Sequence, residues 1–373
     1  MKKIANIVLN DFTNDSRVLK ISKSLAKFGY DPTVVAMHNS ELSESEAIQG
    51  INTERIRLIT RPWPKLKPIQ FLKYIEFLLR STWRFRNADI VHCNDLNALP
   101  VGLLIKLFGR GRKVVYDCHE YETEVVGLKG IEKKGKKWLE RKLIPYADAV
   151  VAVSDSIANE YSRLYDITKP YIVLNCPAYH EQPKRNLFRE YLGIRSDQTI
   201  FLYQGGLSQG RGIELLLEAF SDLELDKNVL VCMGYGPLEG LIREYASHCN
   251  TVFFHPAVSS DVLLSYTSSA DYGILFYEDT CLNHRYCSPN KIFEYLMAGL
   301  PVLTSNLFEM KRMVEAEDVG VVADVNTIEG FKRAIASSLG KSYSVTLNNI
   351  ITKRKIYCWE EQEKVLKEIY DAL

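Results

Sequence analysis

Several features that define large classes of protein are missing from this sequence. Its eight cysteines include no Cys-x-x-Cys pair, and several lie inside apolar runs such as Val229–Cys232. We therefore expect buried free thiols in a reducing compartment rather than a disulfide framework. No run approaches the roughly 18 consecutive apolar residues of a membrane-spanning helix. Lysine and arginine number 47 against 46 aspartates and glutamates, a balance that argues against a dedicated nucleic-acid binder.

What is present is the composition of a globular protein with two domains. The chain has 373 residues, of which 46% are hydrophobic and 25% charged, and this excludes a disordered tail, a collagen-like fibre and a membrane-embedded bundle. At roughly 100–200 residues per domain, the length predicts two domains. The lysine-led start has an apolar run too short for a signal peptide, so we expect a cytoplasmic protein that is soluble or peripheral at the inner face of the plasma membrane.

Short β-rich runs alternate with longer helical patterns, which is typical of parallel α/β architecture. Residues 16–28 show the helical pattern, with Asn14 or Asp15 as N-cap and Gly29 as the stop. A proline-containing, charged stretch, Cys176–Gln198, divides the strands into two series and predicts a linker. The predicted strands are Lys3–Leu9, Thr33–Met37, Arg55–Thr60, Asp89–Cys93, Arg112–Asp117, Ala149–Val153 and Tyr171–Leu174, then Thr199–Tyr203, Asn228–Met233, Thr251–Phe254, Tyr272–Phe276, Pro301–Thr304 and Val319–Ala323.

Polar residues gather where these strands end, and ligands bind at the carboxyl ends of the strands in an open parallel sheet. Two Rossmann-like domains would aim the polar residues of their strand ends into one cleft. The residues selected in this way are Asp11–Arg17, Asn94-Asp95, Asp117–Glu120 and Ser154 in the first half, and Gln204–Gly212, Gly234–Pro237, His255 and Ser305 in the second.

The most informative segment is Cys287–Val302. Ser288 and Pro289 predict the start of a helix whose unpaired N–H groups and dipole would bind an anion such as a diphosphate. Asn290 and Glu294 share one helical face, so a carboxylate lies one turn behind that anion site, where it would accept from both hydroxyls of a ribose. The alternative is an ordinary capped surface helix with a Lys291–Glu294 pair.

A glycine-rich turn follows the first strand of the second half. Gly205–Gly212 holds four glycines in eight residues, which allows close backbone approach to a ligand, and Arg211 within it would bind phosphate bidentately. The turn is neither a Walker A loop nor a G-x-G-x-x-G fingerprint, and a flexible strand–helix turn is the alternative. Gly234–Pro237 is a second glycine turn after a strand, for which a plain turn is the simpler interpretation.

Candidate catalytic groups in the first half lie at two neighbouring strand ends. His119 follows an apolar strand and would donate to a phosphate or a sugar hydroxyl, although a structural histidine is an equal alternative. Asp95 ends the adjacent strand, and His92 is expected in the core. No cluster has metal-ligand spacing, and no nucleophile–base pair emerges from the sequence.

Two stretches of the first half mix cations with aromatic residues, although the net charge is only +1. Residues 61–88 include Lys73 and Trp83, and residues 129–142 include Lys134 and Trp138. This composition suits an anionic membrane surface. A solvated helix face is the alternative for either stretch alone.

Taken together, these motifs resemble the retaining, nucleotide-sugar-dependent glycosyltransferases of GT-B architecture, the large family-4 group. Residues 289–302 resemble the donor-site helix of that group, and Gly205–Gly212 its phosphate loop. The resemblance implies a GT-B fold: an acceptor-binding Rossmann-like domain over residues 1–185, a nucleotide-sugar-binding one over 186–355, and a C-terminal helix, 356–373, that crosses back to the first domain.

The resemblance also implies roles for individual residues. Glu294 would bind the donor ribose and Arg211 the diphosphate, while His119, with Asp95 beside it, would lie near the transferred sugar. The first-domain loop would abut donor and acceptor. The residues expected in these sites are His119, Asp95 and Arg211 for catalysis; Gly205, Gly206, Arg211, Gly234, His255, Asn283, Ser288, Pro289, Asn290, Lys291 and Glu294 for the donor; and Asn14, Asp15, Ser16 and Arg17 in the loop.

Three departures from the family pattern stand out. The position eight residues before Glu294, where the family often has a glutamate, is Tyr286. The usual arginine of the phosphate loop falls at Gly206, which leaves Arg211 to carry more of the diphosphate charge. The first-domain loop has no Gly-Gly pair, only Asn14-Asp15-Ser16. Contacts to the donor sugar are therefore expected from elsewhere, with Asn283 or loop backbone as candidates.

The activity implied by the resemblance is transfer of a sugar from a nucleotide-diphosphate donor, a UDP-sugar, to a hydroxyl of a glycan or lipid-linked glycan, with retention and with no metal or other cofactor. The acceptors expected are those of cell-envelope polysaccharide assembly, at an anionic membrane surface and without nucleic acid. Two alternatives are a nucleotide-sugar 2-epimerase and a non-catalytic sugar-nucleotide-binding subunit. A Rossmann dehydrogenase is disfavoured because no G-x-G-x-x-G follows the first strand.

Overall fold

The computed structural model describes residues 1–221, 227–323 and 327–373. The chain divides into two compact units, which we describe separately. Unit 1 comprises Met1–Val173 and Glu363–Leu373, and unit 2 comprises Leu174–Gln362. The stretch predicted as a linker, Cys176–Gln198, and the boundary placed at residue 185 thus lie within unit 2, and the second division falls inside the C-terminal helix.

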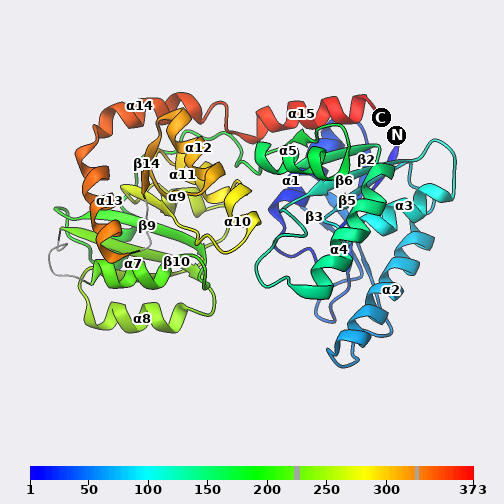
Figure 1. The fold of residues 1–373 in the computed structure, drawn as a ribbon, viewed down its shortest axis with the longest axis horizontal. Helices are drawn as coiled ribbons and strands as arrows, with labels where there is room; N and C mark the ends of the chain where they lie inside the picture. Colours follow the sequence, from blue (N-terminus) through cyan, green and yellow to red (C-terminus); the bar gives the residue numbers. More distant parts are fainter. Residues whose placement is uncertain (222–226, 324–326) are drawn as a thin grey trace. The chain divides into compact units, whose positions relative to one another are not determined.

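Unit 1 is built on an eight-stranded sheet in the order β3-β4-β2-β1-β5-β6-β7-β8 (Figure 1). Its pairings are parallel except that β3 runs antiparallel to β4. The strands are β1 (Lys3–Ile7), β2 (Asp31–Met37), β3 (Ser45–Ile48), β4 (Ile51–Ile56), β5 (Ile90–Asn94), β6 (Lys113–Cys118), β7 (Ala149–Ala152) and β8 (Tyr171–Ile172).

Helices connect these strands, and two begin at the N-caps that their sequences supply. Asp15 accepts from Val18 N at the start of α1, and Ser154 accepts from Ile157 N at the start of α5. The helices of unit 1 are α1 (Ser16–Lys27), α2 (Lys67–Arg84), α3 (Leu99–Leu107), α4 (Gly130–Leu143), α5 (Asp155–Tyr165) and a 3₁₀ turn, η1 (Ile144–Tyr146).

The edge of this sheet differs from the prediction. A strand was expected over Arg55–Thr60, but β4 ends at Ile56 and pairs with β3, which the sequence pattern does not reveal. The two strands form a hairpin with a two-residue turn, Gln49 and Gly50, whose φ angles are 47° and 85°. Two positive φ angles are typical of a type I′ hairpin turn, where Gln is an unusual first residue.

Unit 2 has a six-stranded sheet, entirely parallel within the described residues, in the order β11-β10-β9-β12-β13-β14. Its strands are β9 (Thr199–Gly206), β10 (Asn228–Tyr235), β11 (Val252–Pro256), β12 (Tyr272–Leu275), β13 (Val302–Ser305) and β14 (Gly320–Ala323). Its helices are α6 (Leu187–Leu192), α7 (Ile213–Phe220), α8 (Glu239–His248), α9 (Leu263–Thr267), α10 (Leu282–Tyr286), α11 (Asn290–Met297), α12 (Phe308–Glu317), α13 (Ile328–Gly340) and α14 (Tyr343–Lys353).

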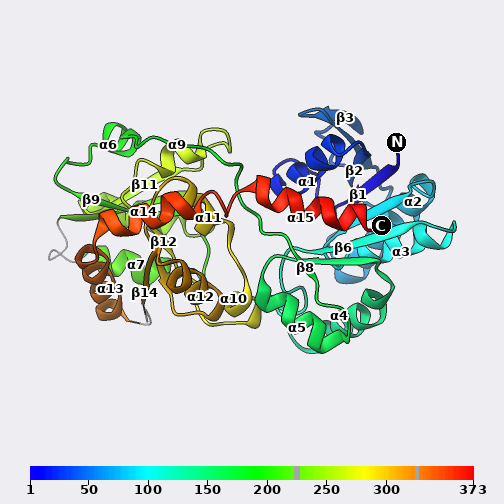
Figure 2. The ribbon, with the colours of Figure 1, turned by 90° about the horizontal axis from the view of Figure 1, so that it is seen from above.

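Alternation along β9 gives unit 2 a core on each face of its sheet. Ile200 and Leu202 pack with residues of α11 and α12 on one face, whereas Phe201 and Tyr203 pack with residues of α7 and α13 on the other. Figures 1 and 2 show these helices on opposite sides of the strands. The central strands are therefore buried on both faces, as in doubly wound α/β folds.

The C-terminal helix, α15 (Trp359–Asp371), returns to unit 1, as expected. Lys27 of α1 forms an ion pair with Glu363 at 2.6 Å, and the hydroxyl of Tyr30 donates to the carbonyl of Tyr370 at 3.2 Å. The Tyr370 ring is buried against Tyr30, with the ring centroids 5.5 Å apart. The end of the chain thereby closes the core of unit 1.

Candidate functional site

A buried ion pair organises the strand ends of unit 1. The Nε and Nη2 atoms of Arg17 donate to the two carboxylate oxygens of Asp117 at 3.0 and 2.7 Å, and its Nη1 donates to the carbonyl of Val173 at 2.9 Å. Both side chains are buried. Arg17 was expected in a loop that touches substrate, but its donors are bound internally. Arg17 therefore supports the site by holding Asp117 in place.

The side chains of two histidines, His92 and His119, lie close to the Asp117 carboxylate. His92 Nε2 lies 3.3 Å from Asp117 Oδ2, and His92 Nδ1 lies 2.8 Å from the hydroxyl of Tyr370. Burial lowers the pKa of His92, so this imidazole is neutral, and it donates through Nε2 because a carboxylate only accepts. Burial would raise the pKa of Asp117, but Arg17 and His119 hold it well below its usual range.

His119 is held in place by hydrogen bonds that run through two asparagines, Asn94 and Asn6. Its Nε2 lies 3.1 Å from Asn94 Oδ1, while Asn94 Nδ2 donates to Asn6 Oδ1 at 2.6 Å and to the carbonyl of Ile7 at 2.8 Å. Asn94 therefore presents its oxygen, and Nε2 of His119 must carry a proton. Burial would lower the pKa of His119, but the carboxylates of Asp95 and Asp117 raise it above the usual value, which favours the imidazolium.

Asp95 brings a carboxylate to the other side of the His119 ring. Its Oδ1 lies 3.6 Å from His119 Nδ1. Asp95 has a φ of 65°, a left-handed conformation that is uncommon outside glycine and often marks a functional site. Its side chain is 40% exposed and that of His119 is 18% exposed. The structure thus brings together the two first-half residues predicted for catalysis, in a position open to solvent.

The loop residues predicted beside this cluster divide by role. Asn14 and Ser16 are exposed, whereas Asp15 caps α1 and also accepts from Asn10 Nδ2 at 3.0 Å. Of the four predicted loop residues, Asn14 and Ser16 are therefore the two whose side chains are exposed for contact with a ligand.

In unit 2, the carboxyl ends of β9 and β10 approach each other closely because both carry glycine. A Cβ added to Gly234 would lie 1.9 Å from the carbonyl oxygen of Gly205. Gly205 has a φ of 107°, and a Cβ there would lie 2.6 Å from Cε of Lys291. Only glycine therefore allows the lysine to lie across the end of β9.

Two cations meet beside this strand end. The guanidinium carbon of Arg211 lies 4.1 Å from the ring centroid of Tyr277, and Lys291 Nζ lies 5.9 Å from that centroid and 5.6 Å from that of Tyr203. Within the described residues, neither cation forms an ion pair with a carboxylate. Burial, and then the charge of Arg211, lower the pKa of Lys291 to about 8. The arrangement is complementary to an anion.

A carboxylate is held one turn further along α11. Gln204 Nε2 donates to Glu294 Oε2 at 2.5 Å, and Gln204 Oε1 accepts from the hydroxyl of Thr267 at 2.8 Å. These bonds fix the amide orientation and hence the carboxylate. Glu294 remains partly exposed, so it keeps capacity to accept from a ligand. Gln204 was selected from the sequence as a strand-end residue, whereas Thr267 is a functional candidate that the sequence motifs do not identify.

The start of α11 corrects one prediction. The N-cap is Pro289, which makes no side-chain cap, and Ser288 does not cap the helix. The hydroxyl of Ser288 instead donates to the sulfur of Met313 at 3.2 Å, and Ser288 is buried. Asn290, the first helical residue, is exposed. The first N–H groups of α11 therefore have no side-chain cap, which leaves them suited to an anionic ligand.

Other predicted donor residues lie apart from this cluster or contribute backbone. His255 is buried among the rings of Phe188, Tyr191 and Tyr266, with centroids 4.7–5.7 Å away, and its Nδ1 contacts the carbonyl of Pro256 at 2.7 Å. The structure does not place it with Arg211 and Lys291. Asn283 is buried in α10, and Gly206 ends β9 with open space at its Cα.

Positions 284 and 286 flank the same region. Tyr286 lies where the family often has a glutamate, and its ring packs against Phe308 with centroids 6.0 Å apart. His284, which no sequence motif marks, packs against Tyr277 with ring centroids 4.9 Å apart, and its Nδ1 lies 2.8 Å from the carbonyl of Glu278. Burial lowers the pKa of His284, so it is neutral beside Arg211. Because His284 belongs to no sequence motif, the sequence does not indicate that it lies beside Arg211.

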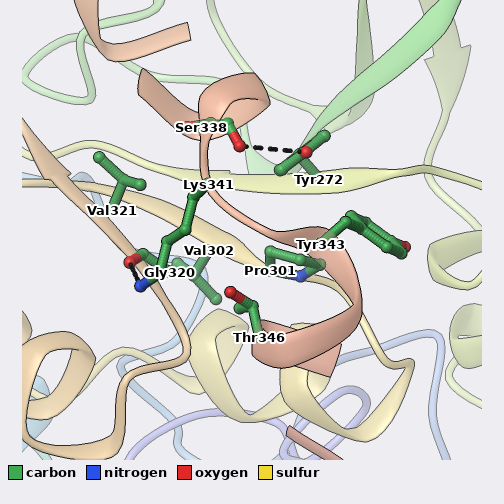
Figure 3. Close-up of a pocket in the computed structure, with 9 residues that line it drawn as sticks. All are labelled: Tyr272, Pro301, Val302, Gly320, Val321, Ser338, Lys341, Tyr343 and Thr346. Carbon is green, nitrogen blue, oxygen red and sulfur yellow. Dashed lines mark hydrogen bonds between the residues drawn. The ribbon is translucent and has the colours of Figure 1, made fainter. Parts of the chain in front are cut away.

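A small pocket in unit 2 lies away from this cluster, at the amino ends of β12, β13 and β14 (Figure 3). Tyr272 donates to the carbonyl of Ser338 at 3.2 Å, and Lys341 donates to the carbonyl of Gly320 at 2.9 Å. Thr346 has a buried hydroxyl that lacks a partner within the described residues. Because ligands of parallel sheets bind at the carboxyl ends, this pocket is not the candidate site.

The two basic, aromatic stretches form exposed helices of unit 1. Leu72, Leu79 and Trp83 follow one another along the outside of α2, and Trp83 is 64% exposed. On α4, Ile131 is 90% exposed and Trp138 is also exposed. Lys67 Nζ lies 3.4 Å from Glu132 Oε2, which brings the beginnings of the two helices together.

The cations of these helices differ in their contacts. Lys73 is buried and donates to the carbonyls of Arg61 and Trp63 at 3.0 and 2.6 Å, so it holds a loop and does not belong to the surface. Lys134 and Lys142 are exposed and lie one turn before and one turn after Trp138, on the same side of α4. No helix among the described residues is long and apolar enough to cross a membrane. Within the described residues, no group of three or more His, Cys, Asp or Glu side chains could hold a metal ion.

Comparison with known proteins identifies relatives for both units. Residues 16–178 match the family model described as Glycosyltransferase Family 4, and residues 198–341 match that described as Glycosyl transferases group 1. A protein of Methanocaldococcus jannaschii described as an uncharacterized glycosyltransferase is 24% identical over 323 residues, 81% of this chain and 78% of that protein.

Solved structures resemble the whole chain. Sucrose-phosphate synthase from Thermosynechococcus elongatus has a TM-score of 0.81 at 18% identity, with 100% of this chain and 98% of that chain covered. Anabaena HepE, in complex with UDP and glucose, has a TM-score of 0.75 at 14% identity, with both chains covered completely. At these identities the likeness shows a common fold.

The buried ion pair generates a stability prediction. Asp117→Asn leaves the Arg17 guanidinium buried without its carboxylate, so we expect the free energy of unfolding at pH 7 to fall by about 3–5 kcal/mol. The pKa of Asp117 is lower in the folded than in the unfolded chain, so its contribution is present above the unfolded pKa, about 4, and is lost as pH falls below it.

Urea unfolding from pH 7 to pH 3 measures both effects. The difference in the free energy of unfolding between wild type and Asp117→Asn should narrow below pH 4. Asp89→Asn, at an exposed aspartate just before β5, provides the control. A gap below 1 kcal/mol at pH 7, or one that widens in acid, would contradict this account.

Proposed function

Because this chain is a glycosyltransferase with the GT-B fold, assembled from a Glycosyltransferase Family 4 part and a Glycosyl transferases group 1 part, we propose that it transfers a sugar from a UDP-sugar to a hydroxyl of a glycan or lipid-linked glycan with retention of configuration. The observation that carries the proposal is the pair of cations, Arg211 and Lys291, beside the uncapped start of α11.

The donor's diphosphate would bind these cations and the first N–H groups of α11. During transfer, negative charge develops on the leaving diphosphate, and preorganised cations and amide dipoles stabilise it more than they stabilise the intact donor. Arg211 and Lys291 supply this positive charge themselves, so the proposed reaction requires no divalent metal. Glu294, oriented by Gln204, would accept from the ribose hydroxyls.

The polar cluster of unit 1 would act on the transferred sugar and the acceptor. His119 is favoured as an imidazolium by Asp95 and Asp117, and it would donate a hydrogen bond to a sugar hydroxyl or a phosphate oxygen. Asn14 and Ser16 offer neutral polar side chains beside the acceptor. The choice of a UDP-sugar is supported by the likeness to Anabaena HepE, a structure solved with UDP-glucose.

We further propose that unit 1 binds an anionic lipid surface through α2 and α4. Leu79 and Trp83 would enter the headgroup region, and Lys134 and Lys142 would face anionic lipids. An interfacial helix combines these two chemistries, apolar burial and attraction to anionic headgroups. A lipid-linked acceptor would then be presented at the membrane where it resides.

Glu294→Ala tests the ribose assignment. Loss of a charged acceptor for the two hydroxyls should weaken UDP and UDP-glucose binding by about 10–100-fold, equivalent to about 1.4–2.7 kcal/mol. Isothermal titration calorimetry measures the change, and Glu244→Ala, at an exposed glutamate of α8, is the matched control. Unchanged affinity in Glu294→Ala would refute the assignment, and absence of UDP binding by the wild type would refute the choice of nucleotide.

Lys291 generates a pH prediction. Its pKa is about 8 in the free protein because of burial and Arg211, and a bound diphosphate would raise it. At pH 8, UDP binding should therefore take up about half a proton, and affinity should fall as pH rises above 8. Calorimetry in buffers of different ionisation enthalpy measures the uptake. Lys291→Met should abolish it, so equal uptake by variant and wild type would show that another group titrates.

Vesicle cosedimentation tests the membrane proposal. The full chain should bind vesicles of phosphatidylcholine and phosphatidylglycerol at low salt, but not phosphatidylcholine alone, and 0.5 M salt should weaken binding. Lys134→Glu/Lys142→Glu should reduce affinity by roughly 10–100-fold, at about 1 kcal/mol per lost charge. Trp83→Ser should also weaken it, whereas Lys227→Glu/Lys355→Glu, in unit 2, should not. Equal loss in the unit 2 variant would contradict a specific surface on unit 1.

A further inference from the structure

Two opposite charges of α11 lie on different sides of the end of β9. Successive residues of a strand point to opposite faces of its sheet. Gln204 points toward α11, where its Nε2 donates to Glu294 Oε2 at 2.5 Å. The amine of Lys291 instead lies over Gly205, where an added Cβ would be 3.1 Å from Nζ, and Nζ is 5.6 Å from the ring centroid of Tyr203, a residue of the core on the other face. The end of the strand therefore keeps the two charges apart.

This separation is not what the helix alone would produce. Residues three apart on a helix are neighbours, with about 5–6 Å between their Cβ atoms, and a lysine and a glutamate at this spacing attract each other. A Lys291–Glu294 pair was the alternative interpretation of the sequence. In the structure the Glu294 carboxylate binds Gln204, and Lys291 forms no ion pair within the described residues.

Gln204 is held in one orientation. Its side chain is buried, and its backbone N–H donates to the hydroxyl oxygen of Tyr295 at 3.2 Å. The hydroxyl of Thr267 lies 2.8 Å from Gln204 Oε1 and 2.9 Å from the carbonyl of Leu263. Because a carboxylate only accepts, Gln204 presents its NH₂ group to Glu294 and its oxygen to Thr267. The hydroxyl proton then points to Gln204, since two oxygens at this distance repel each other without a proton between them.

We propose that Gln204 is a positioning residue for donor binding: by holding the Glu294 carboxylate, it prevents an ion pair between Glu294 and Lys291, so that the carboxylate remains available to the ribose and the ammonium to the diphosphate. This inference rests on the proposed function, because both ligand groups belong to the UDP-sugar. An ion pair between the two side chains would have to break before the donor binds, and affinity would fall. A neutral amide holds the carboxylate without supplying a charge that competes with the donor.

The titration of Lys291 reports on this separation. Burial, and then Arg211, lower its pKa to about 8, against a smaller upward effect of Glu294. The ionisable groups that face Lys291 are Tyr203 from β9, Arg211 from the loop after β9, Tyr277 from the loop after β12, Cys287 from the segment before α11, and Glu294 from α11 itself. Glu294 is the carboxylate of this set, so its approach would raise the pKa of Lys291.

NMR titration of Lys291 in the full chain, through its labelled Cε, tests the inference without any ligand. Gln204→Met, similar in length but without a donor, should release Glu294 to pair with Lys291 and raise the pKa of Lys291 by about one unit or more. Gln204→Asn is one methylene too short to reach Glu294 and should act in the same direction, which keeps the test open if Gln204→Met does not fold. Gln198→Met, at another buried glutamine of unit 2, is the control and should leave the titration unchanged.

A double-mutant cycle shows whether Gln204 acts through Glu294. In Glu294→Gln no carboxylate remains at this position to pair with Lys291, so adding Gln204→Met should change the pKa of Lys291 by less than about 0.3 units. An unchanged pKa of Lys291 in either folded Gln204 variant would overturn the proposal. So would a rise that persists when Glu294→Gln is present.

Calorimetry with UDP and 2′-deoxy-UDP at pH 7 connects the titration to donor binding. The wild type should prefer UDP by about tenfold, since Glu294 would accept from the 2′-hydroxyl. Gln204→Met should bind UDP about tenfold more weakly, because one pKa unit corresponds to a tenfold change in an equilibrium constant, and its preference for UDP should fall below about threefold.

The outcomes separate this inference from the proposed function. Weaker UDP binding by Gln204→Met with the preference for UDP intact would indicate a merely structural role and would overturn the proposal. If the wild type binds no UDP, the proposed nucleotide fails, and if it binds UDP and 2′-deoxy-UDP equally, the ribose assignment of Glu294 fails. In both cases the ligand-free titration of Lys291 still decides whether Gln204 keeps the two charges apart.

Discussion

The buried ion pair between Arg17 and Asp117 is the interaction on which unit 1 depends. Burying two charges is costly, and the cost is offset only when hydrogen bonds satisfy the remaining donors and acceptors. Here the guanidinium binds both oxygens of Asp117 and the carbonyl of Val173, the last residue of unit 1 before the chain enters unit 2. The same carboxylate receives His92, which contacts Tyr370 of α15. The Asp117 carboxylate, directly or through Arg17 and His92, thus connects α1, β5, β6, the end of the first segment of unit 1 and α15. It also faces His119.

In unit 2, by contrast, two cations lie close together without an ion-pair partner among the described residues. Arg211 and Lys291 lie against the same tyrosine ring with no carboxylate paired to either within the described residues. The cost appears in the lowered pKa of Lys291, about 8. Unpaired charge of this kind destabilises the free protein and is relieved by a ligand of opposite sign, which is why perturbed groups of this type gather at binding sites. The charges around Asp117 in unit 1 are therefore paired, while unit 2 holds two cations without an ion pair among the described residues, beside the start of α11.

How far the sequence predicts this molecule depends on the range of the interaction. Most strands were located from apolar runs, and Glu294, Lys291 and Arg211 were selected from local spacing, because a parallel sheet places its strand ends along one edge. The β3–β4 hairpin was missed because Gln49 is an unusual turn residue, and the Ser288 cap was wrong because Met313, distant in sequence, takes its hydroxyl. The long-range partners, Gln204 for Glu294 and Asn94 for His119, follow from tertiary contacts that no local pattern encodes.

The distribution of charge gives the two units different ligands. The exposed edge of unit 1 presents the Asp95 carboxylate beside a single imidazolium, His119. An anionic group is therefore favoured there only in contact with His119, whereas neutral hydroxyls find both donors and acceptors. The corresponding edge of unit 2 presents two cations and amide dipoles, which favour a diphosphate, with one carboxylate placed for a diol. A net charge of +1 for the whole chain conceals this separation. A nucleotide sugar is anionic at one end and rich in hydroxyls at the other. The charge of the unit 2 edge suits a diphosphate, and the mixed donors and acceptors of the unit 1 edge suit hydroxyl groups.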